Sequence, residues 1–327
     1  MRTALALALL LFAAVGFGVP AASAPTARLP RVSIAGRNYV SFDQWARDNG
    51  FRLRWLSKND FTATKGATQM QFNLESRNMS LNGVTVRLSQ PVRNQNGSSY
   101  LAEVDLVTAL QPVLYPPRNR ARGTIKKICI DPGHGGRDPG KQVGGAQEKK
   151  FTMLLALELA AQLRKEGYTV SLTRNGDETL DLPVRPELAR RRGADLFISL
   201  HFNSFTDRAV GGVETYCMTP QRESSSNAQG EGASTGGYVG NLNNSKNMVL
   251  AYEVHKAIIT STRAEDRGIK RARFQVLREA EMPAVLIEGG FMSNPAEAAK
   301  ISSAAWRLQL AQSIVRGVQS YRRMVEP

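Results

Sequence analysis

Along the last two thirds of the chain, short runs of branched apolar residues alternate with stretches of helical periodicity. The runs LFISL at 196–200 and AVLIE at 284–288 are almost free of charge, which is typical of strands covered on both faces. Leu155, Leu159 and Leu163 recur every four residues and mark one apolar face of a helix. This alternation predicts an α/β fold: a three-layer sandwich with a mostly parallel central sheet and helices on both faces.

The same patterns predict individual elements. Strands are expected at 125–131, 168–174, 195–202, 212–218, 274–277 and 284–288, and helices at 149–166, 183–192, 248–263 and 304–323. The region before them contains only short alternating runs, FRLRWL, MQFNLE and VTVRLS, separated by Asn-rich turns. We therefore expect a small strand-rich module in front of the sandwich.

Two segments of this module, 36–40 and 97–101, are similar to each other, and each leads into an apolar stretch. The pattern resembles the small repeat at the N terminus of copper amine oxidases and of many exported wall enzymes. This region holds no histidine and no metal-ligand spacing. The module is therefore interpreted as a spacer or folding domain, with contact to the cell wall as the alternative.

The N terminus matches a secretory signal peptide: Arg2 precedes an apolar run at 4–19, and small residues follow. The run is shorter than a bilayer span usually requires, so we favour cleavage over a retained membrane anchor. A location outside the cytoplasm, secreted into the periplasm or the cell wall, follows. The expected divisions are a signal peptide at 1–24, the module at 30–115, a basic proline-containing linker at 116–124 and the sandwich domain at 125–325.

The formal charge of +15 favours polyanionic partners. No nucleic-acid-binding motif is found in the sequence, and export argues against nucleic acid as the partner. Cys129 and Cys217 both lie in predicted strands. They are compatible with one disulfide and equally with two small buried residues.

Reactive side chains follow several of the predicted strands. His134 lies in a glycine-rich turn after the first strand of the sandwich, His201 closes LFISLH, and Glu288 closes AVLIE. Glu148 lies where the loop after His134 enters its helix. Because ligands gather at the carboxyl ends of strands in an open α/β sheet, we expect these side chains to meet. Two imidazoles and one carboxylate suit a single Zn²⁺ with an open position for water, and Glu288 would serve as the base.

Several longer motifs contain these residues. They are IDPGHGG at 130–136, EKK at 148–150, ADLFISLHFN at 194–203, GGVETY at 211–216 and MPAVLIEGGFMSNP at 282–295. Together they resemble the zinc-dependent N-acetylmuramoyl-L-alanine amidases of the type 3 family over nearly all of residues 125–325. The resemblance implies zinc held by His134, Glu148 and His201, with Glu288 as the catalytic base. The implied reaction is hydrolysis of the amide between N-acetylmuramic acid and L-alanine in peptidoglycan.

Other side chains near the strand ends have two interpretations each. Asn203 either contacts substrate or orients its loop, and Arg278 either holds a stem-peptide carboxylate or forms a surface ion pair. Asp131 either accepts a hydrogen bond from a ligand imidazole or stabilises a turn. His255 lies inside a predicted helix and is interpreted as a surface or packing residue rather than a ligand, and Ser199 as a sheet residue rather than a nucleophile.

The segment 221–246 is rich in Ser, Gly and Asn and is expected to be a mobile surface loop. Some related amidases carry a regulatory helix at this position that blocks the zinc site. Here the segment has no amphipathic stretch, and its acidic residues are Glu223 and Glu231. We therefore expect a flexible rim, with one of these glutamates reaching the metal as the alternative.

Two other functions remain open. A zinc carboxypeptidase acting on wall peptides would use a similar ligand set. An inactive amidase-fold protein that only binds the wall would be expected to have lost a ligand or the base, and all four positions are filled here. The sequence leaves an activator protein undetermined.

Overall fold

The computed structural model describes residues 29–119, 123–226 and 236–326. Its strands are β1 (Arg31–Ile34), β2 (Arg37–Ser41), β3 (Arg52–Trp55), β4 (Asp60–Lys65), β5 (Thr68–Asn73), β6 (Asn78–Leu81), β7 (Val84–Arg87), β8 (Arg93–Gln95), β9 (Ser98–Ala102), β10 (Lys127–Pro132), β11 (Gln142–Val143), β12 (Ala146–Gln147), β13 (Thr169–Leu172), β14 (Leu196–Asn203), β15 (Val213–Met218), β16 (Asp266–Ala272) and β17 (Ala284–Phe291). Its helices are α1 (Phe42–Asp48), α2 (Glu103–Asp105), η2 (Leu106–Leu110), α3 (Gln111–Leu114), α4 (Glu148–Lys165), α5 (Val184–Arg191), η3 (Val239–Asn243), α6 (Asn244–Thr262), α7 (Gln275–Arg278), α8 (Pro295–Ser302) and α9 (Ala304–Val325).

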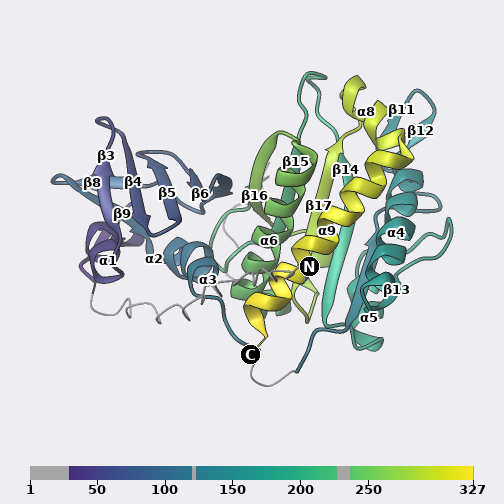
Figure 1. Cartoon of the computed structure of the whole chain (residues 1–327), viewed down its shortest axis with the longest axis horizontal. Helices are drawn as coiled ribbons and strands as arrows, with labels where there is room; N and C mark the ends of the chain where they lie inside the picture. Colours follow the sequence, from purple (N-terminus) through teal and green to yellow (C-terminus); the bar gives the residue numbers. More distant parts are fainter. Residues whose placement is uncertain (1–28, 120–122, 227–235, 327) are drawn as a thin grey trace, which may run out of the picture.

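One 11-stranded sheet runs through the described part of the chain in the order β13-β10-β14-β17-β15-β16-β7-β6-β5-β4-β3 (Figure 1). In its C-terminal portion β13, β10, β14 and β17 pair in parallel, β15 is antiparallel to β17, and β16 is parallel to β15. The mostly parallel central sheet predicted from the sequence is thereby confirmed. The strands from β3 to β7 form an antiparallel meander.

Helices cover both faces of the parallel portion, which confirms the three-layer sandwich. Figure 1 shows α4, α6 and α9 lying together across one face. Leu155, Leu159 and Leu163 of α4 are buried there with Ile198 of β14. Alternate residues of a strand point to opposite faces, and Phe197 packs on the other side with residues of α5 and α7.

The N-terminal module contains a second sheet of four strands in the order β1-β2-β9-β8. The two similar segments of the sequence form β2 and β9, which pair antiparallel, and each strand leads directly into a helix. Trp45, Phe42, Phe61 and Phe72 stack or tilt against one another in the core of the module. The similarity to the copper amine oxidase repeat and the exact domain boundaries stay predictions.

The sequence prediction is wrong for the strand at 274–277, where the structure has the short helix α7. Four apolar-rich residues do not distinguish a strand from a helical turn, because periodicity needs a longer window. The strand in this region is β16, which is rich in charged residues and was not predicted. Helix α8 was also missed, although Asn294 caps it and Pro295 occupies its first turn.

The segment 221–246 is only partly a loop. Residues from Val239 form η3 and the start of α6, so this portion is helical rather than a flexible rim. Glu223 is buried, and its carboxylate accepts hydrogen bonds from Arg37 (3.1 Å) and Gln90 (2.6 Å) of the N-terminal module. It therefore binds the module rather than the metal site, whereas Glu231 lies outside the described residues.

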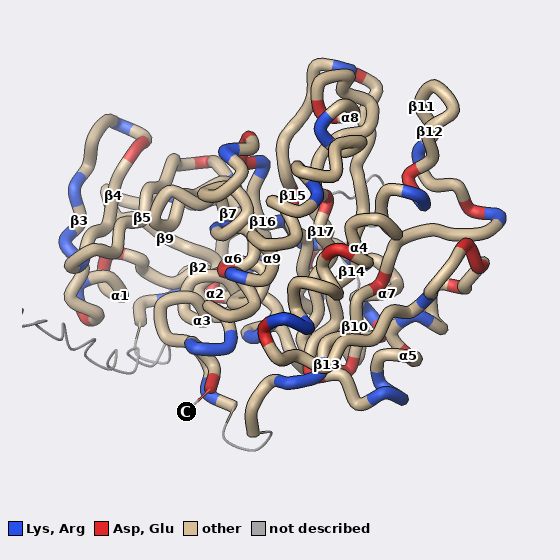
Figure 2. Tube along the Cα trace, turned by 45° about the vertical axis from the view of Figure 1, so that its right-hand side comes forward, with Lys and Arg blue, Asp and Glu red and all other residues tan. Residues whose placement is uncertain are grey.

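The two cysteines are free and buried on different strands, so the interpretation as small core residues is confirmed. The linker region contacts the end of α9: Asn119 N–H donates to Val325 O (2.6 Å), and Ile125 N–H, just after the linker, donates to Glu326 Oε1 (2.6 Å). The predicted signal peptide lies outside the described residues. Among the helices that the structure describes, none is both long and apolar enough to cross a bilayer. Figure 2 shows lysine and arginine spread over both parts of the molecule.

Candidate metal centre

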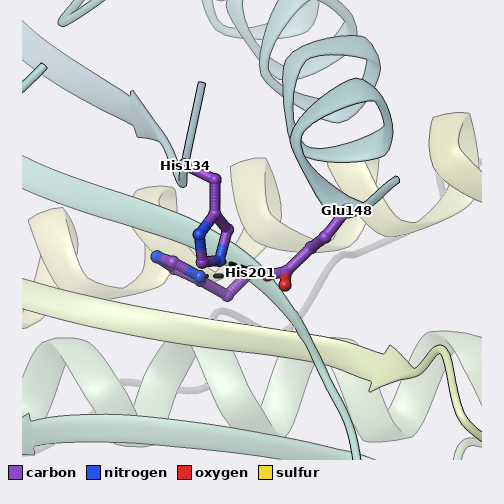
Figure 3. A group of neighbouring side chains, drawn as sticks. All are labelled: His134, Glu148 and His201. Carbon is purple, nitrogen blue, oxygen red and sulfur yellow. Dashed lines mark hydrogen bonds and ion pairs between the residues drawn. The ribbon is translucent and has the colours of Figure 1, made fainter. Parts of the chain in front are cut away.

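Three side chains from separate elements converge at one edge of the parallel sheet (Figure 3). His134 follows β10, Glu148 is the first residue of α4, and His201 lies near the end of β14. Glu148 Oε1 lies 3.0 Å from His134 Nε2 and 3.1 Å from His201 Nδ1. One ligand atom from each of the three residues lies within 4.8 Å of the others. The three donors that the sequence suggested are thus brought together.

The turn that carries His134 depends on small neighbours and an unusual backbone. His134 itself has a φ of 61°, in the left-handed region that disfavours side chains larger than glycine. A Cβ at Gly133 would lie 2.3 Å from His201 Cε1, and a Cβ at Gly140 would lie 2.6 Å from Glu148 Oε2. Both glycines therefore permit a close approach that any larger residue would prevent.

Glu148 is held in place by main-chain donors. Phe202 N–H donates to its Oε1 (3.1 Å) and Lys141 N–H to its Oε2 (2.9 Å). Burial alone would raise the pKa of this carboxyl, but the hydrogen bonds and charges of His134 and His201 outweigh it and hold the pKa well below its usual value. Glu148 is therefore ionised at neutral pH, as a metal ligand must be.

Asp138 completes the surroundings of His134 and was not singled out from the sequence. Its Oδ2 lies 2.7 Å from His134 Nδ1, on the far side of the ring from Glu148. Burial opposes a positive charge on His134, yet the neighbouring Glu148 and Asp138 raise the pKa of the imidazole. A carboxylate that contacts one ring nitrogen of a histidine orients the other nitrogen towards a metal. The sequence signal for this role was an aspartate four residues after His134.

Glu288 lies beside the ligands without joining them. It is opposite His201 in the β14–β17 register and opposite Glu214 in the β15–β17 register. Its Oε2 is buried without a hydrogen-bond partner. Burial, together with the negative charges of Glu148 and Glu214, raises the pKa of Glu288 well above its usual value, and the Lys270 ammonium opposes the shift. A divalent cation at the neighbouring site would favour the ionised form.

Glu214 is surrounded by hydrogen-bond donors. Its carboxylate accepts from Arg267 Nε (2.9 Å), Tyr216 OH (2.7 Å) and Lys270 Nζ. Asn203 Nδ2 donates to the same carboxylate (3.0 Å). This contact fits the interpretation of Asn203 as a residue that orients its loop. A contact between Asn203 and substrate stays a prediction.

A cavity of about 270 Å³ opens next to the cluster. Its polar lining includes Asp131, His134, Asp138, Arg185, His201 and Glu288, and its apolar lining includes Leu182, Phe274, Val276 and Leu286. Arg278 is not among the described residues that line it; its guanidinium lies 5.3 Å from the ring centroid of Tyr238. Its role in holding a carboxylate therefore also stays a prediction.

The remaining candidates occupy buried positions. His255 bonds Thr215 Oγ1 (3.0 Å) and Asp266 Oδ1 (2.8 Å) within the core, as a packing residue does. Asp131 accepts hydrogen bonds from Ser199 and Arg185 rather than from a ligand imidazole. Ser199 is therefore part of a structural network.

Comparison with known proteins agrees with this geometry. The family model described as N-acetylmuramoyl-L-alanine amidase matches residues 128–320. The amidase AmiC of Neisseria meningitidis is 36% identical over 241 residues, which are 67% of this chain and 57% of the relative, so the chain matches little more than half of that protein. The amidase AmiA of Escherichia coli is 30% identical over 63% of this chain and 79% of its own length.

Solved structures are similar over the same region. The amidase AmiC2 of Nostoc punctiforme aligns with a TM-score of 0.51 and 30% identity, covering 62% of this chain and 99% of that structure. The catalytic domain of CwlV, an amidase from Bacillus (Paenibacillus) polymyxa, aligns with a TM-score of 0.51 and 32% identity over 60% of this chain and 97% of its own. The chain belongs to the N-acetylmuramoyl-L-alanine amidase family.

Proposed function

We propose that this chain is a zinc-dependent N-acetylmuramoyl-L-alanine amidase that hydrolyses the amide between N-acetylmuramic acid and L-alanine in peptidoglycan. His134, Glu148 and His201 would hold the zinc, and Glu288 would be the general base. The observation that carries the proposal is the convergence of two imidazole nitrogens and one ionised carboxylate beside the carboxyl of Glu288, whose Oε2 is buried and unpartnered. The site would act outside the cytoplasm, in the periplasm or the cell wall.

The donor set fits zinc. Two nitrogens and one oxygen at these separations suit a four-coordinate ion with one open position, and Asp138 supplies the carboxylate that such histidines usually contact. When bound, zinc lowers the pKa of a water molecule and polarises the scissile carbonyl.

The chain's own groups perform the proton transfers. Glu288 Oε2 accepts the proton of the attacking water and delivers it to the nitrogen of L-alanine as the amide bond breaks. Glu288 lines the cavity beside the ligands, and its Oε2 is buried away from bulk water. Desolvation raises the pKa of this carboxyl, and the Lys270 ammonium acts in the opposite direction. The apolar wall of Leu182, Phe274 and Val276 would contact the substrate around the scissile bond.

Product analysis tests this function. Purified peptidoglycan is incubated with the metal-free chain, with the zinc-loaded chain and with the zinc-loaded chain plus chelator, and the fragments are identified by mass spectrometry. We expect intact stem peptides with a free N-terminal alanine, only in the zinc-loaded sample without chelator. Shortened stems with a blocked alanine would instead indicate a carboxypeptidase. Binding without any cleavage would indicate an inactive wall-binding protein.

A further inference from the structure

Two buried arginines surround the turn that carries His134, and neither has a role in the reaction described above. Arg174 follows β13 and Arg185 lies in α5, and their side chains are almost fully buried. Buried guanidinium groups require many acceptors, because each unpaired donor costs free energy. Here the acceptors include three consecutive main-chain carbonyls of the turn that carries His134, those of Pro132, Gly133 and His134.

Arg174 joins two of the ligand-bearing segments. Its Nε donates to Pro132 O (3.0 Å), and one terminal nitrogen donates to both Gly133 O (2.9 Å) and Lys149 O (2.9 Å). The first two carbonyls precede His134, and the third follows Glu148. Thr152 of α4 adds a hydroxyl donor to Gly133 O (2.8 Å). Arg174 therefore links the His134 turn directly to the first turn of α4.

Arg185 contacts the same turn. Its guanidinium donates to Pro132 O (3.0 Å) and to His134 O (2.9 Å), and it forms an ion pair with Asp131 (2.9 Å). Asp131 Oδ2 in turn accepts from Ser199 Oγ (2.8 Å), two residues before His201 in β14. The network thus reaches the strand that carries the third ligand.

We propose that Arg174 and Arg185 are positioning residues that pre-organise the metal centre: together they clamp the carbonyls of Pro132, Gly133 and His134 and so keep His134 and Glu148 at binding distance. His134 has a positive φ, and a turn in this conformation is retained only when its surroundings hold it. Without these contacts, metal binding would have to order the turn, and this cost would make the binding free energy less favourable. The inference rests on the proposed function in assuming that the three ligands bind a metal.

Arginine is required here rather than any cation. The fork of a guanidinium directs several N–H groups in a plane towards separate acceptors, whereas a lysine ammonium offers one centre on a flexible stem. Arg174→Lys and Arg185→Lys keep the positive charge and remove the fork. Thr152→Val removes one hydrogen-bond donor to Gly133 O and keeps the shape and charge of the side chain. If an arginine variant does not fold, this variant still tests whether the contacts to Gly133 O affect metal affinity.

The test measures metal affinity rather than activity. The full chain and the variants are stripped of metal and titrated with Zn²⁺ in competition with a chromogenic chelator, and folding is checked by circular dichroism. We expect the dissociation constant for Zn²⁺ to rise about 10- to 100-fold in Arg174→Lys and Arg185→Lys, and by a smaller factor in Thr152→Val. With Co²⁺ as the probe, the visible absorption of the arginine variants should depart from the wild-type spectrum, because the ligand geometry changes.

The matched control is Arg271→Lys. Arg271 is also buried and also donates to main-chain carbonyls, those of Thr108 (2.6 Å) and Met218 (3.3 Å), away from the three ligands. Its variant should lose stability and keep the wild-type affinity for Zn²⁺. If the clamp variants fold and bind Zn²⁺ as tightly as the wild type, the positioning role is overturned and the metal centre stands. If the unaltered chain binds no Zn²⁺, both proposals fall.

Discussion

Glu148 and Glu288 are two neighbouring glutamates with opposite shifts in pKa. Desolvation would raise the pKa of Glu148, but the hydrogen bonds and charges of His134 and His201 outweigh it and lower the pKa. Desolvation and then the negative charges of Glu148 and Glu214 raise the pKa of Glu288, whose Oε2 has no hydrogen-bond partner. A permanently ionised carboxylate suits a ligand, and one whose protonation can change suits a base. The difference in environment therefore supports the division of roles that we propose.

Substituting Glu288 by Gln should separate catalysis from metal binding. Glu288→Gln keeps the shape of the side chain and removes its ability to accept a proton. We expect kcat for peptidoglycan hydrolysis to fall about 10²- to 10⁴-fold with the zinc content unchanged, since Glu288 is not a ligand. Activity and metal analysis of the same preparation check both parts. The exposed Glu265→Gln should behave as wild type, and an active Glu288→Gln enzyme would exclude Glu288 as the base.

At the scale of elements, α2 contains a buried carboxylate that supports the turn after β7. Asp105 accepts hydrogen bonds from the main-chain N–H groups of Ser89 (2.6 Å) and Gln90 (2.9 Å). Burial raises the pKa of Asp105 from 3.8 to about 6, although these hydrogen bonds and the charge of Arg271 act in the opposite direction. The folded protein therefore holds this proton more tightly than the unfolded chain does.

This shift predicts a pH dependence of stability. Because the pKa of Asp105 is higher in the folded state, its stabilising contribution is complete below the unfolded value and is lost as the pH rises through about 6. Asp105→Asn removes this dependence. We expect the unfolding free energy of the wild type minus that of Asp105→Asn to decrease between about pH 4 and about pH 6. Denaturant unfolding with chelator present measures it, and a difference that rises over this interval would contradict the assignment.

At the scale of the whole molecule, the N-terminal module and the sandwich domain share one sheet. β7 pairs with β16 through Val86 and Ile269, and the carboxylate of Asp266 accepts from Thr85 N–H (2.7 Å). Tyr252 OH donates to Leu81 O (3.1 Å) across the same boundary. A surface that combines sheet pairing with buried hydrogen bonds fixes the module in one orientation, whatever partner it contacts.

Glu223 is one of the residues through which the segment after β15 contacts the N-terminal module; Arg37 also donates to Arg222 O (2.9 Å). Glu223→Ala removes the partner of Arg37 and Gln90, and we expect the unfolding free energy to fall by about 1–3 kcal/mol. Hydrogen exchange should become faster in β2 and around residues 221–226, while the strands of the metal centre keep their protection. The exposed Glu281→Ala is the control. Unchanged exchange in β2 would show that this contact does not hold the module.

The sequence by itself determined the layers and most of the site. Runs such as LFISL are apolar enough to be buried on both faces, and the four-residue repeat of Leu155 and Leu159 specifies a helix face, so both were found from local pattern alone. His134, His201 and Glu288 were found because parallel strands end at a common edge. Glu148 depended on family resemblance, since a glutamate at a helix start is also favoured by the helix dipole.

Only the tertiary structure decided which groups surround those residues. β16 has a charged sequence and becomes a strand because it pairs with β15 on one side and β7 on the other, a stabilisation that no local pattern carries. The arginines at the His134 turn come from distant segments, and most of their acceptors are main-chain carbonyls. Every residue has such a carbonyl, so the sequence does not indicate which ones an arginine will bind. Chain folding alone selects which carbonyls lie within reach, and with them the arginines that we assign to positioning the metal centre.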